Sequence, residues 1–302
     1  MPSIDLACVG HLVYDIRDYV ESFPSADRTV LLRRAPQISA GGSAANVALN
    51  AIRLGHSSGL VANVGDDPHG RFLLSELARE GINSAHVKLV KKARTALSII
   101  LIDPQGEVMV VEDLGCVDDA RRMPAHLLDD SKWVHVSGCC YEWMRDAAKM
   151  AGKSGKPLSF DPGRAASRMG QKKLEPILKH VDLLIINRKE LAAITGSFSL
   201  EGVKDLSRQY DCSVVLKQGK GPAISCTGGH DQFEVPSFSA PHVVDTLGAG
   251  DAFDTGIICG KLEGRSLYES IKMGHACAAA KVMHAGAQSM PKRSVIRKLF
   301  KF

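Results

Sequence analysis

The sequence contains no C-x-x-C pair, although it has eight cysteines. Several of these cysteines lie in apolar runs, so we expect reduced, buried thiols rather than a zinc site or a disulfide framework. No run of about 18 apolar residues occurs, and the N-terminus lacks a basic segment followed by a long apolar one. We therefore expect a cytoplasmic protein that does not interact with membranes.

The charge is neither strongly one-sided nor clustered. Lys and Arg number 38 against 33 Asp and Glu, a formal net charge of +5. No basic block is long enough to form a nucleic-acid-binding arm, so nucleic acid is not an expected partner. The mild basic excess favours anionic ligands such as nucleotides. The sequence also lacks internal repeats and low-complexity segments, and we expect one domain over residues 1–302.

Short β-branched runs alternate with amphipathic segments along the chain. The strand-like runs, most of them too apolar for a solvent-facing sheet, are IDLACVG, SSGLVANVG, KWVHVS, PLSFD, DLLIIN and SVVLKQG. Helical segments between them, such as SAANVALNAIRLG and KELAAITG, end at glycine, as helices commonly do. The alternation predicts an α/β fold with a mostly parallel central sheet flanked by helices.

Two inserts interrupt this alternation. Residues 14–38 lack a helical period, and residues 95–113 contain two strand-like arms around a DPQG turn. We expect the inserts to pair as a small antiparallel β lid that closes on a substrate. The apolar faces of its arms are too short to form a core of their own. The lid should therefore be mobile or pair with the lid of a second subunit, which predicts a homodimer.

The stretch VVDTLGAGDAFDTG combines glycines with carboxylates near the C-terminus. We expect the stretch to follow an extended segment, APHVV, at the carboxyl end of a strand. Gly248 and Gly250, with Ala249 between them, let backbone N–H groups approach an anion closely. Asp251 then falls on the first turn of a helix, where it can take a proton from a hydroxyl that attacks a phosphate. Alone, the stretch is equally consistent with a turn whose aspartate stabilises a helix N-terminus.

A second glycine cluster, SAGGSAANVALNAIRLG, lies far upstream and is followed by VGDDPHG. Gly41 and Gly42 allow a ligand to approach the backbone, and Ser43 is a candidate cap for the next helix. The Asn46 amide both donates and accepts hydrogen bonds, and Asp15 can accept from paired hydroxyls. Together these groups suit a polyol, although each has an ordinary structural explanation.

AGGSAAN, VGDDPHG and DTLGAGDAF resemble, in order and separation, the two signatures of the ribokinase-like (PfkB) carbohydrate kinases. The resemblance covers nearly the whole chain. It includes LIINRKE, similar to the N-x-x-E element of the family, LKQGKGP at the nucleotide strand, and GHACAAAKVMHAGAQSMP, similar to the C-terminal stretch of ribokinase. It implies a ribokinase-like fold and transfer of the γ-phosphoryl group of ATP to a hydroxyl, with Mg²⁺ as cofactor.

The resemblance also assigns roles to individual residues. It implies that Asp251 is the catalytic base and that the amides of Gly248, Ala249 and Gly250 form an anion hole. The positions implied to hold the sugar-like substrate are Asp15, Gly41, Gly42 and Asn46. The positions implied to contact the nucleotide are Asn187, Glu190, Lys217, Gly219 and His275. Asn187 and Glu190 match the element that organises Mg²⁺ through water.

Asp245 and the loop around Gly286 match positions that carry a monovalent cation such as K⁺ in some members of this family. The chain departs from ribokinase at Val13, where ribokinase has asparagine, so one polar contact expected for ribose is missing. A charged contact from the lid region has no clear counterpart. The candidates for it are Glu112, Arg121 and Glu142.

Three interpretations of the substrate and activity remain open. We favour phosphorylation of a hydroxyl, preferably a primary one, on a monosaccharide or related polyol. A nucleoside is the alternative acceptor, because Val13 and Tyr14 can line an apolar wall for a base. A third interpretation is a catalytically silent sensor that binds a nucleotide or sugar. The presence of Asp251 disfavours it.

Two other nucleotide-binding motifs are excluded by their context. AAKMAGKSG comes within one residue of a P-loop, with Ala147 at the place of the first glycine. A helical stretch precedes it and the strand PLSFD follows, which reverses the order that a P-loop requires, so we interpret GKSGK as a solvated loop. The first strand is not followed by G-x-G-x-x-G, which argues against a dinucleotide-dependent oxidoreductase.

Overall fold

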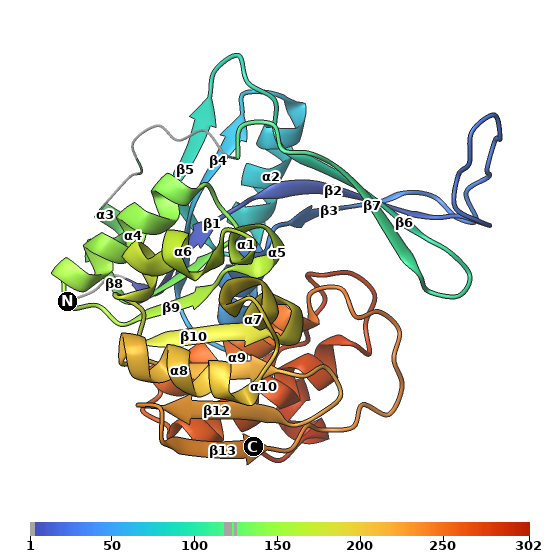
Figure 1. The fold of residues 1–302 in the computed structure, drawn as a ribbon. Helices are drawn as coiled ribbons and strands as arrows, with labels where there is room; N and C mark the ends of the chain where they lie inside the picture. Colours follow the sequence, from blue (N-terminus) through green and yellow to red (C-terminus); the bar gives the residue numbers. More distant parts are fainter. Residues whose placement is uncertain (1–3, 118–122, 124–125) are drawn as a thin grey trace.

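A nine-stranded sheet forms the centre of the computed structural model, which describes residues 4–117, 123 and 126–302 (Figure 1). The strand order is β13-β12-β11-β10-β9-β8-β1-β4-β5. The seven strands from β11 to β5 pair in parallel, and β12 and β13 add an antiparallel hairpin at one edge. The bounds are β1 Ile4–Gly10, β4 Ser58–Gly65, β5 Asn83–Val90, β8 Ser131–Ser137, β9 Leu158–Asp161, β10 Leu183–Asn187, β11 Ser213–Lys217, β12 Ala223–Thr227 and β13 Asp231–Val235. The predicted strands and the mostly parallel sheet are confirmed.

Helices cover both faces of this sheet, because successive side chains of each strand point to opposite sides. In β1, Leu6 and Cys8 pack with α1, α2, α9, α10 and α11, whereas Ala7 and Val9 pack with α4 to α8. The bounds are α1 Ser43–Arg53, α2 Pro68–Arg79, α3 His126–Asp129, α4 Tyr141–Lys153, α5 Gly163–Ser167, α6 Gly170–Leu178, α7 Arg188–Thr195, α8 Leu200–Tyr210, α9 Ala249–Leu262, α10 Leu267–Lys281 and α11 Arg293–Leu299. This is the α/β architecture that the alternating pattern predicts.

A second sheet of four strands, in the order β3-β2-β6-β7, projects from the main body (Figure 1). Its strands come from the two inserts: β2 Val13–Tyr19, β3 Gln37–Gly41, β6 Leu97–Ile102 and β7 Val108–Asp113. The expectation of a purely antiparallel sheet is wrong, because β2 and β6 pair in parallel. These two strands follow β1 and β5, which are parallel members of the main sheet, so both leave it in the same direction.

The segment before α9 also differs from the expectation. Residues 236–246 join neither sheet, and the amides of Val244 and Asp245 both donate to the carbonyl of Val282. Pro236 and Pro241 remove two of the backbone donors that a strand would need. The glycine-rich turn therefore follows an irregular loop rather than a strand.

Three further expectations concern membranes, cysteines and the near P-loop. Within the described part of the chain, no helix is both long and apolar enough to span a membrane. All eight cysteine side chains are buried, as predicted. Residues 152–155 are exposed, as predicted for GKSGK, but Gly152 and Lys153 are the last residues of α4 and only the rest of the motif is a loop.

Candidate active site

One large pocket lies where several parallel strands end. Its lining includes His11 after β1, Ser137 at the end of β8, Asp161 at the end of β9, Asn187 at the end of β10 and Lys217 at the end of β11. This is the edge at which open α/β sheets bind ligands. The cavity volume of about 1500 Å³ exceeds the roughly 300–1,000 Å³ of a single small-molecule site. The pocket therefore has room for two ligands side by side.

The two glycine clusters, far apart in the sequence, meet at this pocket. Asn46 Nδ2 on α1 donates a 2.7 Å hydrogen bond to Asp251 Oδ2 on the first turn of α9, across a separation of 205 residues. Helices α1 and α9 pack against each other beneath this contact. The fold thus places a candidate base beside a candidate substrate-binding amide.

The surroundings of Asp251 suit a proton acceptor. Burial raises the pKa of its carboxyl above the ordinary value, and hydrogen bonds from Asn46 and Ser43 oppose part of that rise. A base with a raised pKa holds an abstracted proton more readily at neutral pH. Ser43 is not the helix cap that the sequence predicts, because Gly42, with φ of 97°, caps α1 and Ser43 is its first residue. Its hydroxyl interacts with Asp251 instead.

The glycine-rich turn presents amides at the start of α9, but not the three that were expected. Ala249 N donates a 3.1 Å hydrogen bond to the carbonyl of Thr246. No acceptor within the described residues engages the amides of Gly250 and Asp251, both of which line the pocket. Gly248 is the N-cap with φ of 79°, and a β-carbon there would lie 2.6 Å from the Ala287 carbonyl oxygen. The free donors at this helix end are those of Gly250 and Asp251.

The upstream glycines leave room for protein atoms. A β-carbon on Gly41 would overlap the Asp15 carboxylate, and one on Gly42 would overlap the His11 carbonyl. Asp15 on β2 is 6% exposed. Burial raises the pKa of its carboxyl to about 7, nearby Glu112 adds to the rise, and Arg17 opposes it. The two glycines therefore let β3 and α1 close around a buried carboxyl group.

The second sheet and α4 bring further polar groups to the same end of the pocket. Glu112 on β7, Ser98 on β6 and Glu142 on α4 line it, and Ser98 Oγ lies 3.5 Å from Glu112 Oε1. Two of the three lid-contact candidates are thus at the pocket. The third, Arg121, lies outside the described residues.

The two residues proposed as an apolar wall for a base do not act together. Val13 lines the pocket. Tyr14 is buried on the other side of β2, where its ring stacks on His69 with centroids 4.2 Å apart and meets the edge of Phe72. Only Val13 is available to a ligand in this arrangement.

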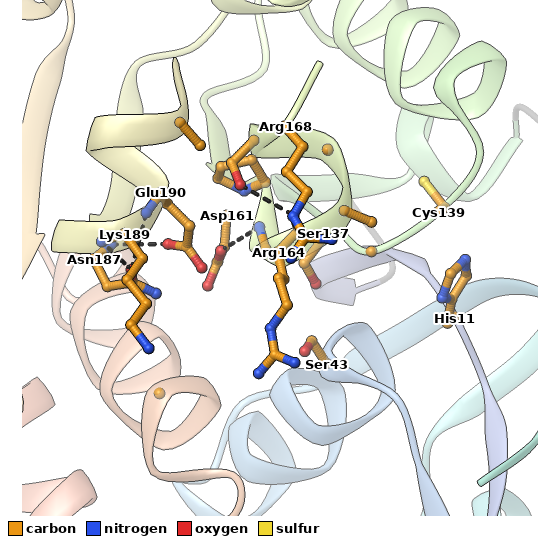
Figure 2. A pocket seen from close by; sticks show the side chains of 18 of the residues that line it. His11, Ser43, Ser137, Cys139, Asp161, Arg164, Arg168, Asn187, Lys189 and Glu190 are labelled. Atoms are coloured by element: carbon orange, nitrogen blue, oxygen red, sulfur yellow. Dashed lines mark hydrogen bonds between the residues drawn. The ribbon is translucent and has the colours of Figure 1, made fainter. Parts of the chain in front are cut away.

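The N-terminus of α7 supplies the next group of residues. Asn187 Oδ1 accepts hydrogen bonds from the amides of Lys189 and Glu190, while Glu190 Oε2 accepts one from Asn187 N at 2.8 Å. This reciprocal capping box fixes both side chains beside Asp161 (Figure 2). Burial raises the pKa of Glu190. Asn187, Glu190 and Gly219 all line the pocket.

Lys217 is held by two carboxylates that the sequence interpretation missed. Its Nζ lies 2.8 Å from Asp161 Oδ2 and 3.2 Å from Asp254 Oδ1. Although burial alone would raise it, the Lys217 ammonium lowers the pKa of Asp161 to about 2. Burial raises the pKa of Asp254 well above its ordinary value. Two signals were present: FDPGR follows a predicted strand, and Asp254 stands one helical turn after Asp251.

His275 does not reach the pocket, contrary to the expectation that it contacts a nucleotide. It is buried in α10, with Nε2 3.1 Å from the Val235 carbonyl and its ring against the edge of Phe253. Asp245 and Gly286 are brought together, since Gly286 N donates to Asp245 Oδ2 at 2.7 Å. Neither of them lines the pocket.

Several cations line the pocket around the α5 and α7 segments. Arg164, Arg168 and Lys189 point into it from the side opposite Ser43 and His11 (Figure 2). They line the same pocket as Gly250 and Asp251 and suit an anionic ligand such as a polyphosphate. Among the described residues, no three His, Cys, Asp or Glu side chains form a cluster that could hold a metal ion by themselves.

Comparison with known proteins gives one consistent result. The model of the pfkB family carbohydrate kinases matches residues 3–293. An ATP-dependent ribose-1-phosphate kinase of Halopiger xanaduensis is 31% identical, covering 93% of each chain. A nucleoside kinase of Methanocaldococcus jannaschii is 26% identical over 94% of this chain and 92% of its own. The structure of Arabidopsis thaliana ribokinase complexed with ribose and ATP superposes with a TM-score of 0.88, at 25% identity and 99% coverage of both chains.

Proposed function

The chain belongs to the pfkB family of carbohydrate kinases, and from that premise we propose that it transfers the γ-phosphoryl group of ATP to a hydroxyl of a monosaccharide or related polyol. The observation that carries the proposal is the 2.7 Å hydrogen bond between Asn46 and Asp251 at the wall of a two-ligand pocket. It joins a group suited to binding a hydroxyl to a group suited to deprotonating one. Neither the site nor the relatives favour a catalytically silent sensor.

Asp251 is the general base in this proposal. Its carboxylate accepts the proton of the acceptor hydroxyl as the new P–O bond forms, the bond to the bridging oxygen breaks and ADP leaves. The carboxylate orients the acceptor and does not itself attack, so no phosphoenzyme forms. The free amides of Gly250 and Asp251 donate to the oxygens of the transferring phosphoryl group. The family resemblance places Gly248 and Ala249 in this anion hole as well. In our proposal they shape the turn instead, because Ala249 N already donates to the Thr246 carbonyl.

The acceptor binds at the end of the pocket next to the second sheet. Glu112 and Glu142 line this compartment. Asp15, Gly41, Gly42 and Asn46 do not line it in this structure, but they lie directly behind lining groups: Asn46 bonds Asp251, Gly42 packs on His11, and Gly41 packs on the buried Asp15. Carboxylates that accept hydrogen bonds from neighbouring hydroxyls suit a neutral polyol. We propose that the four-stranded sheet acts as the lid over this compartment.

The nucleotide binds at the other end, near Asn187, Glu190, Lys217 and Gly219. The residues there fit Mg²⁺ held through water, because a buried carboxylate lines the pocket without a three-ligand protein cage. Mg²⁺ supplies neutralisation of charge on the phosphates. Glu190 would hold the ion through water, and Lys217, fixed by its two aspartates, adds a positive charge near Gly250.

We also propose a homodimer formed through the lid. Every residue of β7 is exposed, although four of its six side chains are apolar: Val108, Met109, Val110 and Val111. An exposed apolar strand at a sheet edge is a common pairing surface. A second copy of the chain is the partner that would cover it in both subunits at once.

Two other acceptor classes are favoured by specific observations. A nucleoside is the alternative because relatives of this length include nucleoside kinases and Val13 offers an apolar contact. A sugar phosphate is a further candidate, because Arg164 and Arg168 line the pocket and the Halopiger relative is a ribose-1-phosphate kinase. Glu112 and Asp15 disfavour an anionic group at the lid end.

The test is ATP consumption with a panel of free sugars, polyols, nucleosides and sugar phosphates, followed by mass spectrometry of the product. We expect a free sugar or polyol to give the highest kcat/KM. A nucleoside or sugar phosphate that outcompetes every neutral sugar would reverse the order of preference. No acceptor-dependent ATP consumption in any class would contradict the kinase assignment.

A further inference from the structure

The family resemblance implies a monovalent cation at Asp245 and the loop around Gly286, but the oxygens of this place are already engaged. Asp245 Oδ1 accepts from Leu247 N at 2.8 Å and Oδ2 accepts from Gly286 N at 2.7 Å. The Asp245 carbonyl accepts from Lys281 Nζ at 2.8 Å. Each of these hydrogen bonds occupies an acceptor position that an ion would otherwise use.

Lys281 supplies a positive charge at the centre of the same place. It is the last residue of α10, and its side chain is 0% exposed, so it is among the largest fully buried side chains of the described residues. Its Nζ also lies 3.4 Å from the His284 carbonyl. Burial lowers the pKa of Lys281 to about 8, so the ammonium form still predominates at neutral pH. Lys281 therefore places its positive charge among backbone carbonyl oxygens, where a bound monovalent ion would otherwise lie.

Three other carbonyls of the loop also accept hydrogen bonds. The carbonyl of Val282 accepts from the amides of Val244 and Asp245. Ser289 Oγ donates to the carbonyls of His284 and Gly286 at 3.1 and 2.6 Å. The carbonyls of Asp245, Val282, His284 and Gly286 thus all accept hydrogen bonds from within the protein.

A second cation lies close by. Arg17 of β2 is 4% exposed, and its guanidinium packs against Gly286, where an added β-carbon would be 2.9 Å from Nη1. Its charge acts on Lys281. Asp15 acts on Arg17, and Asp245 and Asp251 act on Lys281, so both cations already have carboxylate partners. A further monovalent ion at this place would be repelled by both positive charges. The residues present do not fit the ion that the family resemblance implies.

We propose that the Lys281 ammonium takes the place of the monovalent cation and makes the kinase activity of this chain independent of K⁺. Lys281 is a positioning residue: it fixes the Asp245 backbone three residues before Gly248, and Gly248 packs on Ala287 of the same loop. The charge thereby holds the turn that presents the Gly250 and Asp251 amides. This inference rests on the proposed kinase function.

The first test uses the unaltered protein. Acceptor-dependent turnover is measured in K⁺, Na⁺, NH₄⁺ and tetramethylammonium salts at matched ionic strength. We expect turnover to change by less than about twofold, because the structural charge is part of the chain. Activation of severalfold by K⁺ over tetramethylammonium, with saturation, would overturn the proposal.

The second test removes the charge with Lys281→Ala, which leaves space and free carbonyls. We expect turnover without K⁺ to fall by about 10- to 100-fold, as on loss of an outer-shell positioning group. K⁺ or NH₄⁺ should restore turnover with saturation, and tetramethylammonium, which is too large, should not. Lys272→Ala, on the same helix, is the matched control and should remain insensitive to K⁺. Unimpaired turnover of Lys281→Ala in tetramethylammonium would contradict the positioning role.

A readout without substrate separates this inference from the kinase assignment. The thermal unfolding midpoint of Lys281→Ala should rise when K⁺ replaces tetramethylammonium, whereas the midpoint of the unaltered protein should not move. This comparison holds even if every acceptor tested fails to be phosphorylated. If Lys281→Ala does not fold in any salt, Lys281→Met replaces it in the K⁺-free arm, and a K⁺-induced rise of the midpoint in the unaltered protein still overturns the proposal.

Discussion

One strand from each of the two sheets shows the extremes of burial in this protein. All eight residues of β4 in the larger sheet are buried, whereas all six residues of β7 in the second sheet are exposed. Asp161, Asn187 and Lys217 stand at the ends of strands of the larger sheet, and Glu112 stands on β7 of the second sheet. Groups on a rigid, packed scaffold hold their geometry, and groups on an exposed sheet move with it. We infer that the larger sheet fixes the phosphoryl-transfer groups and that the second sheet determines which acceptor is held.

The largest expected effect on turnover is at the phosphoryl-transfer groups. Asp251→Asn should lower kcat by about 10²–10⁴, because the acceptor proton loses its base, while nucleotide affinity stays within a few-fold. Turnover and nucleotide titration are measured on the same preparations. Asp205→Asn, an exposed aspartate on α8, is the matched control and should behave as the unaltered protein. Near-normal turnover of Asp251→Asn with the true substrate would show that Asp251 is not the base and that the GAGD turn only binds phosphate.

The glycine-rich turn offers a sharper separation of structure from function. A β-carbon on Gly250 meets only Lys217 Nζ, at 3.7 Å, whereas one on Gly248 meets the Ala287 backbone at a residue with φ of 79°. Gly250→Val should fold normally but bind nucleotide about 10-fold more weakly, because its side chain covers the free amides. Gly248→Ala should lower the free energy of unfolding by about 1–3 kcal/mol through backbone strain. Calorimetric titration measures the nucleotide affinity of both variants, and thermal unfolding measures their stability. The assignment fails if Gly250→Val binds nucleotide normally.

The acceptor side should respond to pH through Asp15. Burial raises the pKa of its carboxyl to about 7, and only the ionised form accepts hydrogen bonds at both oxygens. Acceptor affinity should therefore rise with pH, and KM should fall by roughly tenfold between about pH 6 and about pH 8. Asp15→Asn should give a weaker but pH-independent KM. A KM that increases over this range would show that the protonated form binds.

The smallest effect on turnover is expected at the outer surface of the lid. Val110→Lys places a charge on the exposed β7 strand and should shift a dimer toward monomer in sedimentation velocity. Because no phosphoryl-transfer residue lies there, kcat should change by less than about twofold. A protein that is monomeric at micromolar concentration before the substitution would remove the dimer proposal.

The sequence predicted much of the larger sheet and the two glycine clusters, because their signals are local. IDLACVG and DLLIIN are apolar runs of strand length, and both form strands. What it did not predict depends on residues distant in the chain. The parallel pairing of β2 with β6 follows from where β1 and β5 end, and the contacts of Lys217 join β11 to β9 and α9. Local signals mark Asp161 and Asp254 as candidate polar residues, but nothing local pairs them with Lys217.

His275 and Lys281 show the same limit within one helix. Both lie in the stretch that resembles the C-terminus of ribokinase. His275 packs on Phe253 away from the pocket, and Lys281 fills the place expected for an ion. A motif gives the position of a residue in the chain, but the packing of α9 against α10 decides what its side chain reaches.

Direct transfer to an acceptor hydroxyl activated by Asp251 is the central claim, and mass spectrometry of one reaction mixture tests it most directly. The intact protein and the acceptor are weighed at successive times after addition of ATP and Mg²⁺. The account predicts that the acceptor gains one phosphoryl group while the mass of the protein never changes. A phosphorylated protein that forms before the product and decays as the product appears would contradict it.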